Sequence, residues 1–354
     1  MRQYFPLCIF LALVVLIQLV TQITETAFYL TQLTMSAYYS LLIIGLCTIM
    51  GYAGQISLGH AGFFAIGGYL SAGLTTHNLQ PFADTGITSL LDKAGLLVSS
   101  KDLYGDTLLT VHPWIACIVA ISTAVIIALV LGGPVLKLKG HYLAMATLGF
   151  GIIIFRIAMA TPYFGEADGL SGVPSFTLLP GITVSGDFGA RIINYYIAWG
   201  TVLIGMLLLI NLVNSRMGRA LSALHGSEEA AQAMGVNTAR AKLLTFVLSA
   251  AYAALAGVLL THYNGSIGPG EAGVMKSVRY VAIVAIGGMA HLWGALIIGT
   301  LLNFMSMRGL FGSYDDAVFG IILILIMLFA PQGLLRLHIW KHIQKIKPKK
   351  HGTA

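Results

Sequence analysis

The sequence predicts an all-α, polytopic membrane protein: a bundle of about ten spanning helices with two glycine-broken segments. Two observations support this class. Hydrophobic residues make up 57% of the 354 residues and charged residues only 9%, whereas charged residues form about a quarter of ordinary soluble domains. The apolar residues also fall in runs close to the roughly 20 residues that a helix needs to cross a bilayer. A water-soluble domain is therefore excluded.

Ten apolar segments are candidate spans. The first lacks a small-x-small cleavage site, so we expect it to stay in the protein as a helix. The stretch 271–307 is too long for one helix, and it divides at the glycine-rich segment Gly287–Gly294. The predicted spans are 4–20, 29–50, 61–78, 113–136, 141–160, 192–213, 242–262, 271–288, 292–307 and 317–334. A count of eight or nine stays open because the divided halves are short.

The charges of the loops predict the orientation. Short basic loops lie on the cytoplasmic side of a membrane, and the loop 214–241 is basic. The loops 79–112 and 161–191 carry acidic residues, which suits the outer side. Ten spans then place both termini in the cytoplasm, including the basic tail 336–354, which would lie against anionic lipid headgroups. The chain is thus one membrane domain, 1–354, with a periplasmic insertion at 79–112.

Two glycine-rich breaks interrupt the apolar pattern. Non-helical backbone at membrane depth is tolerated where protein or a water-filled cavity satisfies its amides. Paired breaks in the two halves of a transporter are typical of a central pathway, although glycine also permits close helix packing. The pathway candidates are Gly51, Gly54, Gln55, Ser57, Gly59 and His60 in the first break, and Gly287 and Gly288 in the second.

Ionisable residues are scarce inside the spans. Glu271, Lys276 and Arg279 begin the eighth span, so we expect them at its outer mouth, paired with one another. The sequence holds no chain of intramembrane carboxylates, which argues against a proton- or sodium-coupled carrier. The three cysteines show no metal-binding spacing, and the basic residues do not indicate nucleic-acid binding.

The sequence also argues against an enzyme. It contains no Walker A motif, no HExxH zinc motif and no GxSxG nucleophile elbow. A charged segment between two apolar spans, Arg219–Gly235, instead predicts a water-exposed helical surface that ends at a glycine. A surface of this kind suits contact with a partner protein outside the bilayer.

Several motifs occur in an order that resembles a known family. They are GYAGQISLGHAGFFAIGGY (51–69), KLKGHYLAMATLGFG (137–151), the charged segment 219–235, KLLTFVLSAAYAALAGVLL (242–260), VAIVAIGGMAHLWGALIIG (281–299) and MLFAPQGLL (327–335). Together they resemble the inner-membrane permease subunits of bacterial branched-chain amino acid ABC importers, the LivM-like branch. The resemblance covers nearly the whole chain beyond residue 35. The insertion 79–112 departs from it, because relatives keep this loop shorter.

The resemblance implies a fold similar to type II ABC importer permeases and a set of partners. A second, homologous permease would complete the pathway, two ATP-binding cassette subunits would bind and hydrolyse ATP, and a periplasmic binding protein would deliver the substrate. The chain itself would need no cofactor or metal. The implied coupling residues are Arg219, His225, Glu228, Glu229, Ala230, Ala231 and Gly235.

The residues of this segment suit such a role. Small alanines at 230 and 231 let a short helix seat closely in a groove, and the glutamates at 228 and 229 can meet basic groups of a partner. A urea or short-chain amide permease shares these motifs and remains the closest alternative function. A secondary transporter is a more distant one, because it would not need a cytoplasmic coupling helix.

Overall fold

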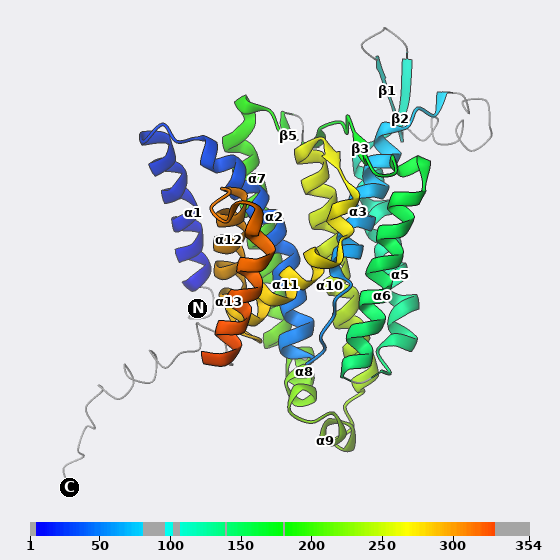
Figure 1. Cartoon of the computed structure of the whole chain (residues 1–354), viewed down its shortest axis with the longest axis vertical. Coiled ribbons are helices and arrows are strands. Elements are labelled where there is room, and N and C mark those ends of the chain that lie inside the picture. The colour runs from blue at the N-terminus through cyan, green and yellow to red at the C-terminus, as the bar shows by residue number, and fades with distance from the viewer. Residues whose placement is uncertain (1–4, 81–95, 102–106, 139, 180, 330–354) are drawn as a thin grey trace, which may run out of the picture.

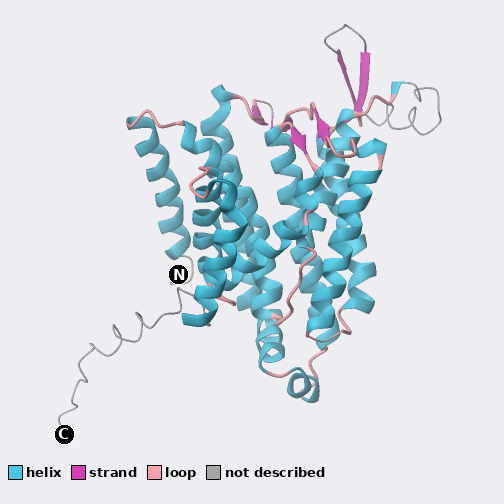
Figure 2. Ribbon diagram, viewed as in Figure 1, coloured by secondary structure: helices cyan, strands magenta, loops and turns pink. Residues whose placement is uncertain are grey.

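The computed structural model describes residues 5–80, 96–101, 107–138, 140–179 and 181–329. In these residues most helices run side by side along one direction (Figures 1 and 2). The helices are α1 (Phe5–Ile23), α2 (Phe28–Cys47), α3 (His60–Thr76), α5 (Pro113–Val135), α6 (His141–Ala160), α7 (Arg191–Asn214), α8 (Arg216–Gly226), α9 (Glu228–Ala233), α10 (Thr238–Asn264), α11 (Val274–Gly287), α12 (Leu292–Met307) and α13 (Asp315–Phe329). The predicted all-α membrane bundle is confirmed.

A helix stands at each of the ten predicted spans, but they differ in length. Within the described residues, six helical segments are long and apolar enough to cross a membrane. The other four, α3, α11, α12 and α13, have only 14 to 17 residues. At about 1.5 Å per residue, α3, α11 and α12 fall short of a 30 Å hydrocarbon core, whereas α13 reaches the last described residue, Phe329. The glycine-rich breaks explain α3, α11 and α12, because each of them begins or ends at a break.

α2, α3 and α10 form the buried centre of the bundle. In the most apolar 18-residue window of each long helix, 89% of the residues are buried for the helix that contains α2 and 67% for α10, but only 22% for α1 and α6. α10 packs against α3 through glycines: a Cβ at Gly67 would overlap the Ala254 backbone, and one at Gly257 would overlap the Phe64 carbonyl. The glycines thus allow the backbones to touch, which is how membrane helices gain packing without a hydrophobic driving force. α1 and α6 lie at the periphery.

Short strands lie at one end of the bundle and were not predicted. β1 (Leu97–Lys101) and β2 (Thr107–Val111) form an antiparallel hairpin in the insertion 79–112. This hairpin projects beyond the helices (Figure 2), and we call that end the hairpin end. Two smaller pairs are β3 (Leu170–Ser171) with β6 (Ser266–Ile267) and β4 (Phe176–Leu179) with β5 (Ile182–Val184). The acidic centre of the insertion, like the basic tail 336–354, lies largely outside the described residues.

Candidate functional site

The predicted coupling segment forms two helices at the end of the bundle opposite the hairpin (Figure 1). Ser215 caps α8 by accepting a hydrogen bond from the Met217 N–H at 3.1 Å. Ser227 then ends α8 and caps α9, accepting from the Ala230 N–H at 3.3 Å. Gly235 follows with a φ of +81°, the left-handed conformation that glycine adopts at helix ends. The segment is therefore a bent pair rather than a single helix.

The coupling candidates divide into exposed and inward-facing residues. Ala231 is 3% exposed, and Glu228 turns toward α10, so neither presents a free side chain at the surface of α9. The exposed coupling candidates are Arg219, His225, Glu229, Ala230 and Gly235. The surface available to a partner is consequently narrower than the sequence indicates.

An ion pair fixes α9 to the start of α10. Lys242 Nζ lies 2.6 Å from Glu228 Oε1, and the Lys242 side chain is only 8% exposed. Gln232 adds a hydrogen bond from its Nε2 to Thr238 Oγ1 at 2.8 Å. A charge that is this well buried needs its partner, so the ion pair and the hydrogen bond hold α9 against the start of α10.

The first glycine-rich break begins within a π-helical turn, η1 (Thr48–Tyr52). It continues as non-helical backbone until α3 begins at His60. His60 is 1% exposed, with Nδ1 3.1 Å from Ser57 Oγ and Nε2 2.6 Å from Ser249 Oγ. The Leu58 N–H donates to Thr147 Oγ1 at 2.9 Å. Neighbouring helices thus provide hydrogen-bond partners for the Leu58 N–H and for His60, and both ring nitrogens of His60 are within hydrogen-bond distance of serine hydroxyls.

The second break turns the chain between α11 and α12. Gly288 has a φ of +99° and Ala290 a φ of +64°. His291 Nδ1 accepts a hydrogen bond from the Gly294 N–H at 2.9 Å and so caps α12. A Cβ at Gly287 would lie 2.7 Å from the Gly294 carbonyl oxygen. Gly287 therefore allows α11 and α12 to meet closely, which is a packing role.

The two breaks and the coupling helices touch one another. A Cβ at Gly51 would overlap the backbone of Ala290, so the first break packs directly on the second. A Cβ at Gly54 would lie 3.1 Å from the His225 Nδ1 of α8. Gly59 makes a similar contact with α6, where a Cβ would lie 2.7 Å from the Thr147 carbonyl oxygen. The sequence predicted each segment separately, but it did not predict these contacts.

The same region encloses a cavity of about 230 Å³ that Gly54 and Gln55 line from the first break. His225 and Glu228 line it from the coupling helices, and Lys242 lines it from α10. Four of the residues that line this cavity are polar, Gln55, His225, Glu228 and Lys242, so it differs from the packed core around it. Candidates from both predicted sets, the first break and the coupling segment, therefore border a common space.

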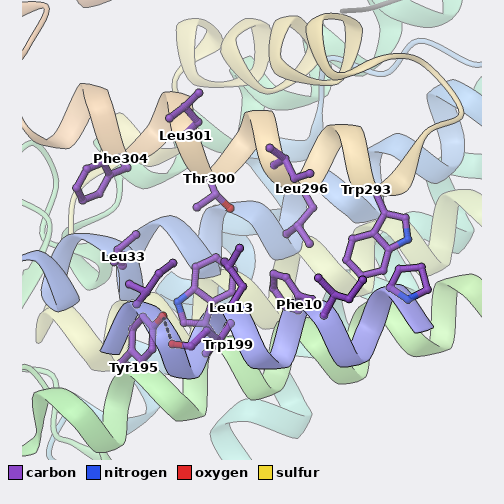
Figure 3. A pocket seen from close by; sticks show the side chains of 15 residues that line it. Phe10, Leu13, Leu33, Tyr195, Trp199, Trp293, Leu296, Thr300, Leu301 and Phe304 are labelled. Atoms are coloured by element: carbon purple, nitrogen blue, oxygen red, sulfur yellow. Dashed lines mark hydrogen bonds between the residues drawn. The ribbon is translucent and has the colours of Figure 1, made fainter. Parts of the chain in front are cut away.

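A larger groove of about 560 Å³ lies elsewhere, between α1, α2, α7 and α12. Figure 3 shows that aromatic and aliphatic side chains, including Phe10, Trp199 and Trp293, line it. Its position beside the peripheral α1 and its apolar lining suit lipid contact better than a polar solute. None of the predicted pathway residues borders it.

A charged cluster lies deeper in the bundle than expected. Glu271 pairs with Lys276 at 3.1 Å, and the Tyr39 hydroxyl donates to Glu271 at 3.1 Å. Tyr39 is eleven residues into α2, which places it about 16 Å from that helix's start. Arg279 pairs with Asp316 at 2.7 Å rather than with its own neighbours. The predicted pairing is thus present for Glu271 and Lys276 but not for Arg279. The predicted position at the outer mouth of the span is wrong, because the cluster lies deeper in the bundle.

Replacing Lys242 by methionine is expected to destabilise the protein. Glu228 would lose its partner, and since its side chain is 27% exposed, we expect a modest cost of about 1–2 kcal/mol. Thermal unfolding of the purified protein measures this cost. In the double variant with Glu228→Gln the two costs should not add, because both changes remove one interaction. Full additivity would contradict the proposed link between α9 and α10.

Comparison with known proteins identifies the family. The family described as "Branched-chain amino acid transport system / permease component" matches residues 28–327. The chain is 31% identical to the high-affinity branched-chain amino acid transport system permease protein LivM of Salmonella typhimurium over 325 residues, which is 85% of this chain and 68% of that protein.

Two further relatives agree. The chain is 29% identical to LivH of Escherichia coli, covering 85% of this chain and 92% of LivH. It is 28% identical to BraD of Pseudomonas aeruginosa, covering 88% and 97%. Both carry the same description as branched-chain amino acid permease proteins. No solved structure matches the chain. The chain belongs to the family of permease components of branched-chain amino acid transport systems.

Proposed function

We propose that the chain forms half of the translocation pathway of an ATP-driven importer for branched-chain amino acids. The α8–α9 end faces the cytoplasm and docks on a partner ATPase, and the hairpin end faces the periplasm, where a binding protein delivers the substrate. A second, homologous permease supplies the other half of the pathway. Similarity to both LivM and LivH, two permease proteins of Escherichia coli, supports this pairing.

One observation supports the coupling role: α8 contacts the first glycine-rich break, and the first break packs on the second. His225 of α8 abuts Gly54, and Gly51 of the same break packs on Ala290 of the second. A displacement of α8 therefore passes through the His225 side chain to the first break, and from there through packed backbone at Gly51 and Ala290 to the turn between α11 and α12. Packed interfaces of this kind transmit small movements because they do not deform continuously.

The site supports transmission of movement rather than chemistry. ATP hydrolysis by the partner subunits would move α8 and α9, and the ion pair of Lys242 with Glu228 would carry that movement into α10. α10 packs on α2, α3 and α5, so its movement reaches the centre of the bundle. The substrate would then pass between this chain and the second permease.

Uptake by the reconstituted importer tests the proposal. The chain is combined in liposomes with its second permease, its ATPases and its binding protein, and labelled leucine, isoleucine, valine and urea are compared. We expect ATP-dependent uptake of the three amino acids, with urea at background. Uptake of urea in preference to leucine would make the chain an amide permease. Uptake driven by an ion gradient without ATP would make it a secondary transporter.

A further inference from the structure

The cavity of about 230 Å³ at the coupling helices has the features of a ligand site. Four separate elements enclose it: the first break, the start of α6, the α8–α9 pair and the start of α10. A molecule bound there would touch the first break, α8, α9 and α10, which are the elements where the proposed movement begins. The cavity lies within one subunit, apart from the deeper charged cluster around Glu271.

A buried amide in this cavity lacks a partner. Gln55 is 4% exposed, and neither its Oε1 nor its Nε2 makes a hydrogen bond. Buried polar groups in native proteins are nearly always paired with protein, water or ligand. The amide offers one acceptor and two donors to whatever occupies the cavity.

The charges of the cavity balance. Lys242 and Glu228 lie 2.6 Å apart, through Oε1 of the carboxylate. The Lys242 ammonium has three N–H donors and the Glu228 carboxylate has two acceptor oxygens, so each can form a further hydrogen bond. A ligand that carries only a negative charge would be repelled by the Glu228 carboxylate, and one that carries only a positive charge would be repelled by the Lys242 ammonium. A molecule that carries both charges satisfies both residues.

The cavity also has aliphatic lining residues, which we call its aliphatic wall. Ile56 lines it from the first break, Leu138 and Leu143 from the segment that leads into and begins α6, and Leu224 from α8. A ligand that suits both the charged and the aliphatic residues therefore has a zwitterionic head and a short aliphatic side chain.

We propose that this cavity binds an aliphatic α-amino acid on the side to which the importer releases its product. The carboxylate contacts Lys242 and the Gln55 amide N–H, the ammonium contacts Glu228, and the side chain lies against the aliphatic wall. This inference rests on the proposed function, which supplies such a molecule at this end. The bound product links the first break to α9 and α10 and holds them in one arrangement. It therefore inhibits the importer as its product accumulates.

The test uses the complete importer in lipid nanodiscs, with both permeases and both ATPases but without the binding protein. L-leucine at millimolar concentration is added, and both basal ATP hydrolysis and direct leucine binding are measured. We expect hydrolysis to fall by about fivefold or more, within the usual range of allosteric coupling. Urea at the same concentration should have no effect.

Two tryptophan variants locate the effect. Leu138→Trp fills the aliphatic side of the cavity, and Leu138 is already 40% exposed, so the chain should still fold. Tyr142→Trp is the matched control, because Tyr142 lies only four residues further on, in the first turn of α6, is 71% exposed and does not line the cavity. Leucine should inhibit the wild type and the control and should neither bind nor inhibit the Leu138 variant.

Three results would overturn the inference. Equal inhibition of all three proteins would place the leucine site elsewhere. The absence of leucine binding in the wild type would mean that the cavity holds water only. Inhibition by urea and not by leucine would assign it to a neutral amide. Leucine uptake with the binding protein present is measured in parallel, so that normal uptake beside any of these results rejects the feedback site and leaves the proposed function intact.

Discussion

Uptake should fall by at least about tenfold when Gly51 is replaced by valine, because overpacking a well-packed site costs about 1–3 kcal/mol and this site cannot relax easily. Any Cβ at Gly51 overlaps the Ala290 backbone nitrogen and Cα. Backbone cannot rotate away as a side chain can, so the two breaks must separate. Leucine uptake by liposomes, normalised to the amount of assembled importer, measures the effect.

Gly149→Val provides the matched control for Gly51. Gly149 also lies in an apolar helix, but a Cβ there would meet nothing within 4 Å. This variant should assemble and transport as the wild type does. If valine at 51 transports normally, the packing of the two breaks has no part in transport. If valine at 149 is equally harmful, the effect reflects β-branching in a membrane helix rather than the contact with Ala290.

The second large effect is expected for Glu229→Lys, which should abolish uptake while the protein still inserts and assembles with its partner permease. Glu229 is exposed on α9, so its replacement disturbs no buried contact. A reversed charge at a partner interface places like charges together, which costs several kcal/mol. ATP hydrolysis should then no longer respond to the binding protein, and measuring hydrolysis beside uptake shows this uncoupling.

Glu25→Lys is the control for this charge reversal. Glu25 is also exposed, but it lies in the turn between α1 and α2, at the end opposite α9. It should leave both uptake and stimulated hydrolysis unchanged. Normal uptake by the Glu229 variant would remove α9 from the docking surface. Loss of uptake in both variants would point to the net charge of the protein instead of to docking.

The positions of the helices could be predicted because each apolar run is flanked by charge, proline or glycine. His112 and Pro113, for example, mark the start of α5, where His112 caps the helix and Pro113 occupies its first turn. The two breaks were predicted for a similar reason, since glycine and polar residues there interrupt the apolar pattern. Their contact with each other was not, because nothing local relates Gly51 to Ala290 across more than 200 residues of sequence.

Other features of the candidate site depend on tertiary structure. Ala231 resembles its neighbour Ala230 in sequence, yet it is buried because α9 bends back at Ser227. The depth of Glu271 follows from the path of the chain after Gly265, which has a φ of +67° and redirects the backbone into the bundle. A signal was present, since Glu271, Lys276 and Arg279 fall within nine residues of an apolar span. Ionisable residues at such positions are functional candidates by default.

The hydrogen bonds of the first break to residues much later in the chain have a consequence for biosynthesis. The Leu58 N–H depends on Thr147, and His60 depends on Ser249, which are 89 and 189 residues later in the chain. When α2 and α3 leave the ribosome, neither partner has been synthesised, and lipid offers no hydrogen bonds in their place. During synthesis, the first break must therefore remain in contact with water or a chaperone until α6 and then α10 have been inserted.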